Sequence, residues 1–167
     1  MPTARSTRSR PGTTTGSRAL PKLLKDLKAD HARVKKAYQE FKKLDVDENP
    51  DECEALVRQV LSELTVHATL EEEILYPAAR EVLDEDDLLD EALVEHESAH
   101  ALIDQLSSMG PEDDMYAARF TVLCEYVMHH VKEEEDEMFP KLARADLDWE
   151  GLASLTEARR ADLTPSA

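Results

Sequence analysis

Histidines and glutamates recur in this sequence at the spacing of one helical turn. Three pairs lie four residues apart: His67 and Glu71, His96 and His100, and His130 and Glu134. Residues four apart share one face of a helix, so each pair can offer two donor atoms to a single ion. Imidazole nitrogens and carboxylate oxygens are ligands of iron, manganese and zinc. The spacing therefore indicates transition-metal binding.

A fifth histidine, His31, lies on an apolar stripe of its own and brings the candidate ligands to seven. One histidine on an apolar face is usually a satisfied core residue. A whole layer is different, because a buried carboxylate without a partner costs several kcal/mol. Seven ligands exceed the four of a tetrahedral zinc site. The pattern predicts two ions bridged by the glutamates, with iron favoured and manganese or zinc less so.

The elements that must position these ligands are predicted from apolar residues at alternating spacings of three and four. Four stripes have this pattern: Leu20 to Phe41, Cys53 to Ala78, Leu89 to Leu106, and Tyr116 to Met138. Asn49 is expected to cap the second helix, with Pro50 at its first position, and Gly110-Pro111 to end the third. Four helices with short connections predict an all-α, antiparallel up-down-up-down four-helix bundle.

Composition and charge suggest three segments along the chain. Residues 1–20 contain four arginines and no acidic residue and are expected to be a disordered basic tail; an organelle transit peptide or a weak polyanion contact are alternatives for it. Residues 21–143 would form the bundle, and residues 144–167 a C-terminal appendage with a short helix around Trp149, Leu152 and Leu155.

The overall composition excludes several classes of protein. With 4 Gly, 5% aromatic and 34% charged residues, an all-β fold is disfavoured. The net charge of −17 argues against binding of DNA or an acidic membrane by the main body. No apolar run approaches the roughly 18–20 residues that span a bilayer. Cys53 and Cys124 are too few for a disulfide scaffold, so we expect a soluble, cytoplasmic protein with reduced thiols.

The two halves of the chain repeat one pattern, H-x-x-x-E followed by an aromatic-Pro pair, Tyr76-Pro77 in the first half and Phe139-Pro140 in the second. Together with the preceding histidines, this order of ligands resembles the hemerythrin-like, HHE cation-binding family over about residues 21 to 140. The resemblance implies the following ligands: His96, His100 and His130 to one iron, His31 and His67 to a second, and Glu71, Glu134 and an oxo or hydroxo group as bridges. The second iron would then keep an open position.

That open position implies a small ligand, namely dioxygen, peroxide or nitric oxide. Oxygen-carrying invertebrate hemerythrins have an Asp five residues after the last histidine, whereas this chain has Glu134 four residues after His130. This resembles bacterial and regulatory members, so storage, sensing and detoxification all stay open. A peroxide- or nitric-oxide-detoxifying enzyme, catalase-like in the first case, and a metal-stabilised interaction module are the alternatives. We expect a monomer or weak oligomer, with His129 a bystander on the helix flank.

Overall fold

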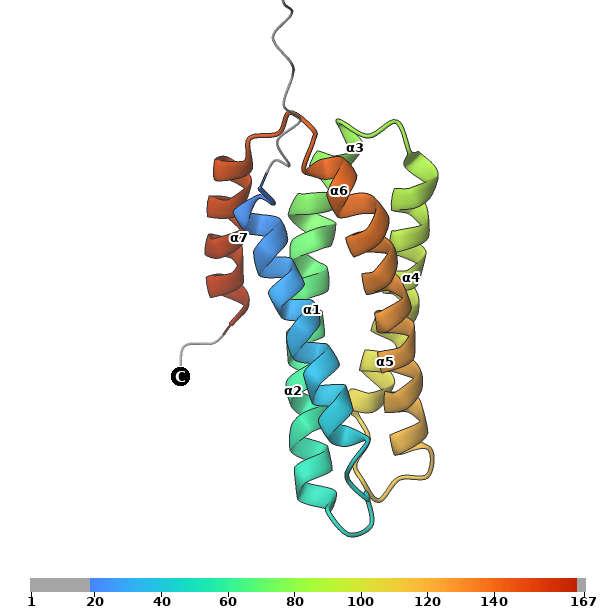
Figure 1. Ribbon diagram of the computed structural model, residues 1–167. Helices are drawn as coiled ribbons and strands as arrows, with labels where there is room; N and C mark the ends of the chain where they lie inside the picture. Colours follow the sequence, from blue (N-terminus) through green and yellow to red (C-terminus); the bar gives the residue numbers. More distant parts are fainter. Residues whose placement is uncertain (1–18, 165–167) are drawn as a thin grey trace, which may run out of the picture.

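The computed structural model describes residues 19–164, and these residues form helices and connections without a strand. The four long helices alternate in direction along the chain, down, up, down and up in the view of Figure 1, so the predicted antiparallel four-helix bundle is confirmed. In chain order the elements are α1 (Lys22–Phe41), α2 (Pro50–Leu70), η1 (Glu71–Leu75), α3 (Tyr76–Arg80), α4 (Asp86–Ser107), α5 (Tyr116–Glu133), η2 (Glu134–Met138), α6 (Phe139–Leu142) and α7 (Trp149–Leu163). The two η elements are single π-helical turns, which join α2 to α3 and α5 to α6 as continuous rods.

One expected cap and one expected helix end differ from the sequence prediction. The helix α2 begins at Pro50, as predicted, but the side chain of Asn49 before it makes no capping hydrogen bond. The third helix ends at Ser107, before Gly110. Gly110 instead belongs to the following turn, where its N–H donates to Asp113 Oδ2 over 2.8 Å. Glycine is thus used here for a turn rather than for a helix cap.

The core of the bundle is divided into two apolar clusters. The lower cluster runs from Val34 to Phe41 on α1 and includes Phe120 and Leu123 on α5. The upper cluster includes Leu24 and Leu27 on α1 together with residues of α3, α4 and α6. All the buried histidines and glutamates lie in the layer between the two clusters. Close packing above and below fixes the height at which each rod presents its polar side chains.

The C-terminal helix α7 lies outside the four-helix bundle, alongside α1 and α2 (Figure 1). The side chain of Asp148 caps its first turn by accepting a hydrogen bond from the Gly151 N–H. Two arginines near its end reach the bundle, Arg159 to Glu73 and Arg160 to Asp30. The predicted short C-terminal helix is therefore present, and it is tied to the bundle by ion pairs.

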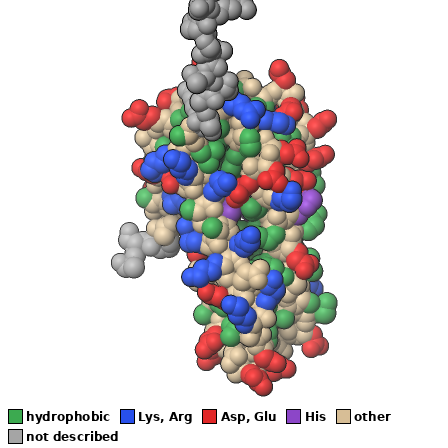
Figure 2. Space-filling view, viewed as in Figure 1, with side chains coloured by type: hydrophobic (Ala, Val, Ile, Leu, Met, Phe, Trp, Pro, Cys, Tyr) green, Lys and Arg blue, Asp and Glu red, His purple; other side chains and the backbone are tan. Residues whose placement is uncertain are grey.

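Charge is unevenly spread over the surface. Figure 2 shows Lys and Arg side chains along the face that carries α1, where Lys25, Lys35 and Lys36 are exposed. Asp and Glu side chains lie at both ends of the bundle in this view, including the end that holds the α1–α2 and α4–α5 connections. Among residues 19–164, no helix is long and apolar enough to cross a membrane. The basic tail predicted for residues 1–20 lies, apart from its last two residues, outside the described part of the chain.

Candidate metal centre

Four histidines meet in pairs at the centre of the bundle. The Nε2 atoms of His31 and His67 lie 3.1 Å apart, and those of His96 and His130 also lie 3.1 Å apart. Ring nitrogens bound at about 2.0–2.1 Å to neighbouring positions of one ion are on the order of 3 Å apart. Both pairs have ring centroids 4.7 Å apart, with interplanar angles of 65° and 66°. The repeat in the sequence thus becomes two nearly equivalent half-sites.

Two glutamates lie between the half-sites, and each directs its oxygens to both of them. Glu71 Oε1 lies 3.2 Å from His67 Nε2, and Glu71 Oε2 lies 3.4 Å from His96 Nε2. Glu134 Oε2 lies 3.3 Å from His31 Nε2 and 3.6 Å from His130 Nε2. Each carboxylate is thus in contact with both histidine pairs. This is the arrangement that a carboxylate bridge between two ions requires.

A second layer of carboxylates holds the other nitrogen of each inner ring. The contacts to Nδ1 are His31 to Glu135 at 2.9 Å, His67 to Asp30 at 3.1 Å, His96 to Glu72 at 2.7 Å and His130 to Glu95 at 2.7 Å. A hydrogen bond from Nδ1–H to a carboxylate fixes the ring and leaves the Nε2 lone pair directed at the ion. These contacts hold the four inner rings in the orientation that metal binding through Nε2 would need.

Electrostatics in this layer favour positive charge. Burial by itself lowers the pKa of His67, but the carboxylates of Glu71 and Asp30 outweigh it and raise that pKa to about 10. Burial lowers and nearby carboxylates raise the pKa of His31 and His96 as well, with a net upward shift. The pKa of Glu71 is held well below its ordinary value by His67 and His96, against the effect of burial. Protons on the histidines thus balance the negative charge of the buried carboxylates. A divalent cation would displace these protons and balance the same charge better.

Two buried oxygens supply the test of fit for a metal. Glu71 Oε1 and Glu134 Oε2 have no hydrogen-bond partner, although the two side chains are 0% and 1% exposed. Buried oxygens without partners are rare, because each costs about 1–3 kcal/mol or more when the group is charged. Both oxygens face the Nε2 atoms of histidines, at 3.2 Å from His67 and 3.3 Å from His31, and in the neutral rings these nitrogens would offer lone pairs to an ion. The donor set therefore fits a pair of divalent ions.

One polar group in the centre was not among the candidates from the sequence. The hydroxyl of Tyr76 donates to Glu134 Oε1 over 2.8 Å and lies 3.2 and 3.3 Å from Nε2 of His96 and His130. It is also 3.3 Å from Glu71 Oε2. Its counterpart in the second half, Phe139, has no hydroxyl and stacks on His31. The difference between Tyr and Phe in the repeated aromatic-Pro pair is the signal that could have identified it.

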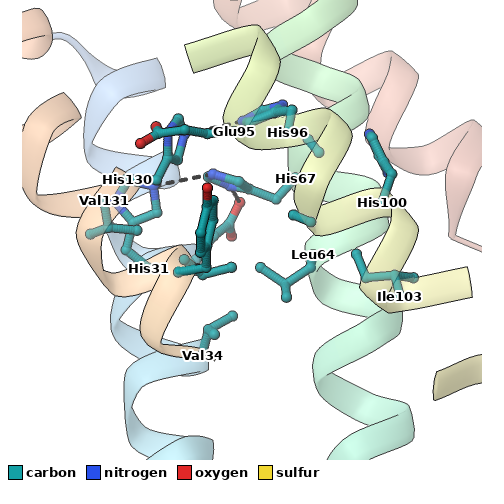
Figure 3. Close-up of a pocket in the computed structure, with 15 residues that line it drawn as sticks. His31, Val34, Leu64, His67, Glu95, His96, His100, Ile103, His130 and Val131 are labelled. Carbon is teal, nitrogen blue, oxygen red and sulfur yellow. Dashed lines mark hydrogen bonds and ion pairs between the residues drawn. The ribbon is translucent and has the colours of Figure 1, made fainter. Parts of the chain in front are cut away.

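The two remaining histidines lie outside the inner cluster. His100 is 38% exposed, and its Nε2 lies 2.8 Å from Glu72 Oε1; Figure 3 shows it to one side of the other labelled histidines. His129 is 65% exposed and lies 3.2 Å from Glu133, as expected for a bystander. The structure thus brings six of the seven predicted ligands together and places His100 next to the Glu72 that supports His96. Coordination by each of the seven stays a prediction.

A small apolar cavity lies directly against the histidine layer (Figure 3). Its volume is about 30 Å³, and its apolar lining includes Val34, Leu64, Ile103, Val127 and Val131. A single water needs about 10–15 Å³ on this measure. The cavity therefore has room for a diatomic molecule next to His31, His67, His96 and His130, all of which line it. Tyr76 is not among its lining residues.

Comparison with known proteins agrees with this geometry. The family model described as the hemerythrin HHE cation binding domain matches residues 22–142. A crystal structure of a hemerythrin HHE cation binding domain-containing protein from Mycobacterium kansasii has a TM-score of 0.68 at 22% identity, over 86% of this chain and 90% of that one. At this identity the likeness shows the fold alone.

A curated relative has a different name. A Nostoc protein named DNA nickase is 29% identical over 113 residues, which are 68% of this chain and 31% of that protein. This chain therefore spans about a third of the relative's length.

Proposed function

The chain belongs to the hemerythrin HHE cation-binding domain family, and we propose that it holds two iron ions, joined by an oxo or hydroxo group, in order to bind or sense a small ligand. The proposed protein ligands are His31, His67, Glu71, His96, His100, His130 and Glu134. The ligand would be dioxygen, peroxide or nitric oxide. A pair of iron ions supplies redox chemistry and an open coordination position. Manganese or zinc are less favoured, because nitrogen and carboxylate donors in a helical bundle suit iron well.

The observation that carries this proposal is the apolar cavity against the bridged histidine pairs. A metal that only stabilises the fold needs no space beside it. Here Val34 and Leu64 leave a cavity of about 30 Å³ next to His31 and His67. An apolar wall disfavours charged groups and bulk water, because neither finds a hydrogen-bonding partner there. A small, weakly polar molecule is the ligand class that such a space admits.

The half-site of His31 and His67 is where we place ligand entry. The resemblance assigns three histidines, His100 among them, to the other ion and only two to this one. If His100 coordinates the other ion, the ion at His31 and His67 therefore has one protein ligand fewer and keeps a free position. The Nδ1 contacts to Glu135 and Asp30 keep both rings in place when that position is filled.

Metal analysis combined with optical spectra tests the proposal. Protein loaded with iron under anaerobic conditions should hold two ions per chain, and its visible spectrum should change when dioxygen is added and return when dioxygen is removed. A protein that binds iron but whose ferrous form ignores dioxygen, peroxide and nitric oxide would instead have a structural metal. Release of oxygen from added peroxide in repeated turnovers would show a catalase-like enzyme rather than a reversible binder.

We propose the reducing cytoplasm as the compartment, because both cysteines are free and buried rather than bonded. A monomer or weak oligomer is the proposed state. The activity named for the Nostoc protein is not part of this proposal, since this chain spans 31% of it and its charge of −17 repels a DNA backbone. Metal-dependent nicking of supercoiled plasmid by the loaded protein would overturn that exclusion.

A further inference from the structure

The carboxylate of Asp30 connects the C-terminal helix to the metal centre. Asp30 is 4% exposed, and its Oδ2 atom has two partners. His67 Nδ1 lies 3.1 Å from Oδ2, and the guanidinium of Arg160 donates to the same oxygen over 2.7 Å. The other oxygen, Oδ1, accepts from Arg33 on the same helix. A single oxygen thus joins α7 to a ring whose opposite nitrogen lies in the proposed ligand layer.

This contact distinguishes Asp30 from the other three carboxylates that hold inner rings. Glu135 pairs with Lys28 of α1, Glu72 with His100 of α4, and Glu95 lies 3.8 Å from His129 of α5. All these partners are on bundle helices. Within residues 19–164, Asp30 alone among the four has a partner from α7. That helix lies beyond residue 142, where the family match ends.

A neighbouring arginine offers a natural comparison. Arg159 makes a two-point ion pair with Glu73, at 2.7 and 2.9 Å. The Arg159 and Arg160 side chains are similarly exposed, at 37% and 31%, but their partners are not: the Glu73 side chain is 47% exposed and that of Asp30 6%. An exposed pair contributes little, whereas a buried carboxylate depends strongly on its partners. The two arginines thus tie the same helix down through one surface contact and one contact to the centre.

We propose that Arg160 is a positioning residue for the metal centre, acting through Asp30 on His67. The inference rests on the proposed function. By holding Oδ2 towards the interior, Arg160 keeps the acceptor of the His67 Nδ1–H in place while Arg33 draws Oδ1 towards the surface. The orientation of the His67 ring, and with it one of the two half-sites, therefore depends on α7 being docked. The other half-site, His96 and His130, has supports that do not involve α7.

Titration of the metal-free full-length protein with Co²⁺ tests this inference, with visible absorption and competition by a chelator as readouts. The parent protein should bind two ions. Arg160→Gln should weaken one of them by about 10- to 100-fold, the usual effect of losing a group that orients a ligand, and leave the other unchanged. Arg160→Lys, which keeps the charge, should recover part of the loss. Arg159→Gln is the matched control and should bind both ions as the parent does.

A second readout follows the ring itself. In the Zn²⁺-loaded protein, the Nδ1–H proton of His67 should be protected from exchange and observable by NMR in the parent and in Arg159→Gln, and lost to exchange in Arg160→Gln. Equal effects of the two Gln variants, or none from Arg160→Gln, would overturn the inference. If Arg160→Gln does not fold, Arg160→Lys and Arg160→Met take its place. Full affinity for both ions in both of these variants would also overturn the inference. A parent protein that binds no Co²⁺ would instead contradict the proposed function.

Discussion

The hydroxyl of Tyr76 donates a hydrogen bond of 2.8 Å to Glu134, 58 residues further along the chain. This contact depends on a π-helical turn. On a regular α-helix, residues five apart point about 140° away from each other, so Glu71 and Tyr76 would not share a face. The π turn from Glu71 to Leu75 makes the Tyr76 N–H donate to the Glu71 carbonyl five residues back. That turn brings the phenol within 3.3 Å of Glu71 Oε2 and 2.8 Å of Glu134 Oε1.

Tyr76 and His100 both lie near His96, and two variants test whether each contributes to metal binding there. Tyr76→Phe removes a hydroxyl oxygen that lies 3.2 Å from His96 Nε2 and 3.3 Å from His130 Nε2. We expect this variant to change the visible spectrum of the iron-loaded protein and to lower its iron content. His100→Ala removes a proposed ligand, whose ring is bonded to Glu72, and we expect this variant to lose one ion and to change the visible spectrum. Full retention of both ions and of the visible spectrum in His100→Ala would contradict the assignment of His100 as a ligand, which the family resemblance implies.

The sequence was sufficient to predict the bundle and most of its polar layer. Apolar spacing and the H-x-x-x-E pairs follow the period of an α-helix, so residues such as His67 and Glu71 could be assigned to one face. Tyr76 could not, because the π turn breaks that period just where Pro77 removes a backbone donor. The role of Asp30 was also hidden, since it depends on Arg160, 130 residues away. Position along one helix was predictable, whereas contacts between helices were not.

Removing the metal should destabilise the folded protein through Glu71 and Glu134. At a free ion concentration about 1,000 times Kd, binding contributes about 4 kcal/mol per site, or on the order of 10 °C in Tm for a chain of this length. Chelation should therefore lower the Tm of the parent by at least that amount. In Glu71→Gln/Glu134→Gln the chelator should have little effect. Glu133→Gln, on the surface beside His129, is the control and should respond as the parent does, as differential scanning calorimetry will show.

Alkaline pH should destabilise the protein through Cys124. Burial, followed by the nearby Glu125, raises the pKa of this thiol from 9.0 to about 12. Because the folded state favours the neutral thiol, its contribution is complete below pH 9 and is lost as pH rises towards 12. The free energy of unfolding should fall by at most about 1.4 kcal/mol per pH unit from this group. Urea titrations between pH 8.5 and 10 give the free energy of unfolding at each pH, and this free energy should fall less steeply with pH in Cys124→Ala than in the parent. The range stops at pH 10 because Tyr116, with a pKa of about 12, contributes above it. Equal dependence on pH in the two proteins would contradict this prediction.

Filling the apolar cavity should impair ligand binding without removing the metal. Ala99 lines the cavity on α4, and Ala99→Val adds two methyl groups to a space of about 30 Å³. Overpacking a tight site costs about 1–3 kcal/mol, which corresponds to a roughly 5- to 150-fold loss when it opposes an incoming ligand. We expect iron content to be unchanged and nitric oxide affinity, measured by optical titration of the ferrous protein, to fall within that range. Ala101→Val, two residues along the same helix and exposed, should bind nitric oxide as the parent does. Equal affinity in Ala99→Val and Ala101→Val would mean that the ligand does not occupy this cavity, and the histidine layer would then have to be reached from another side.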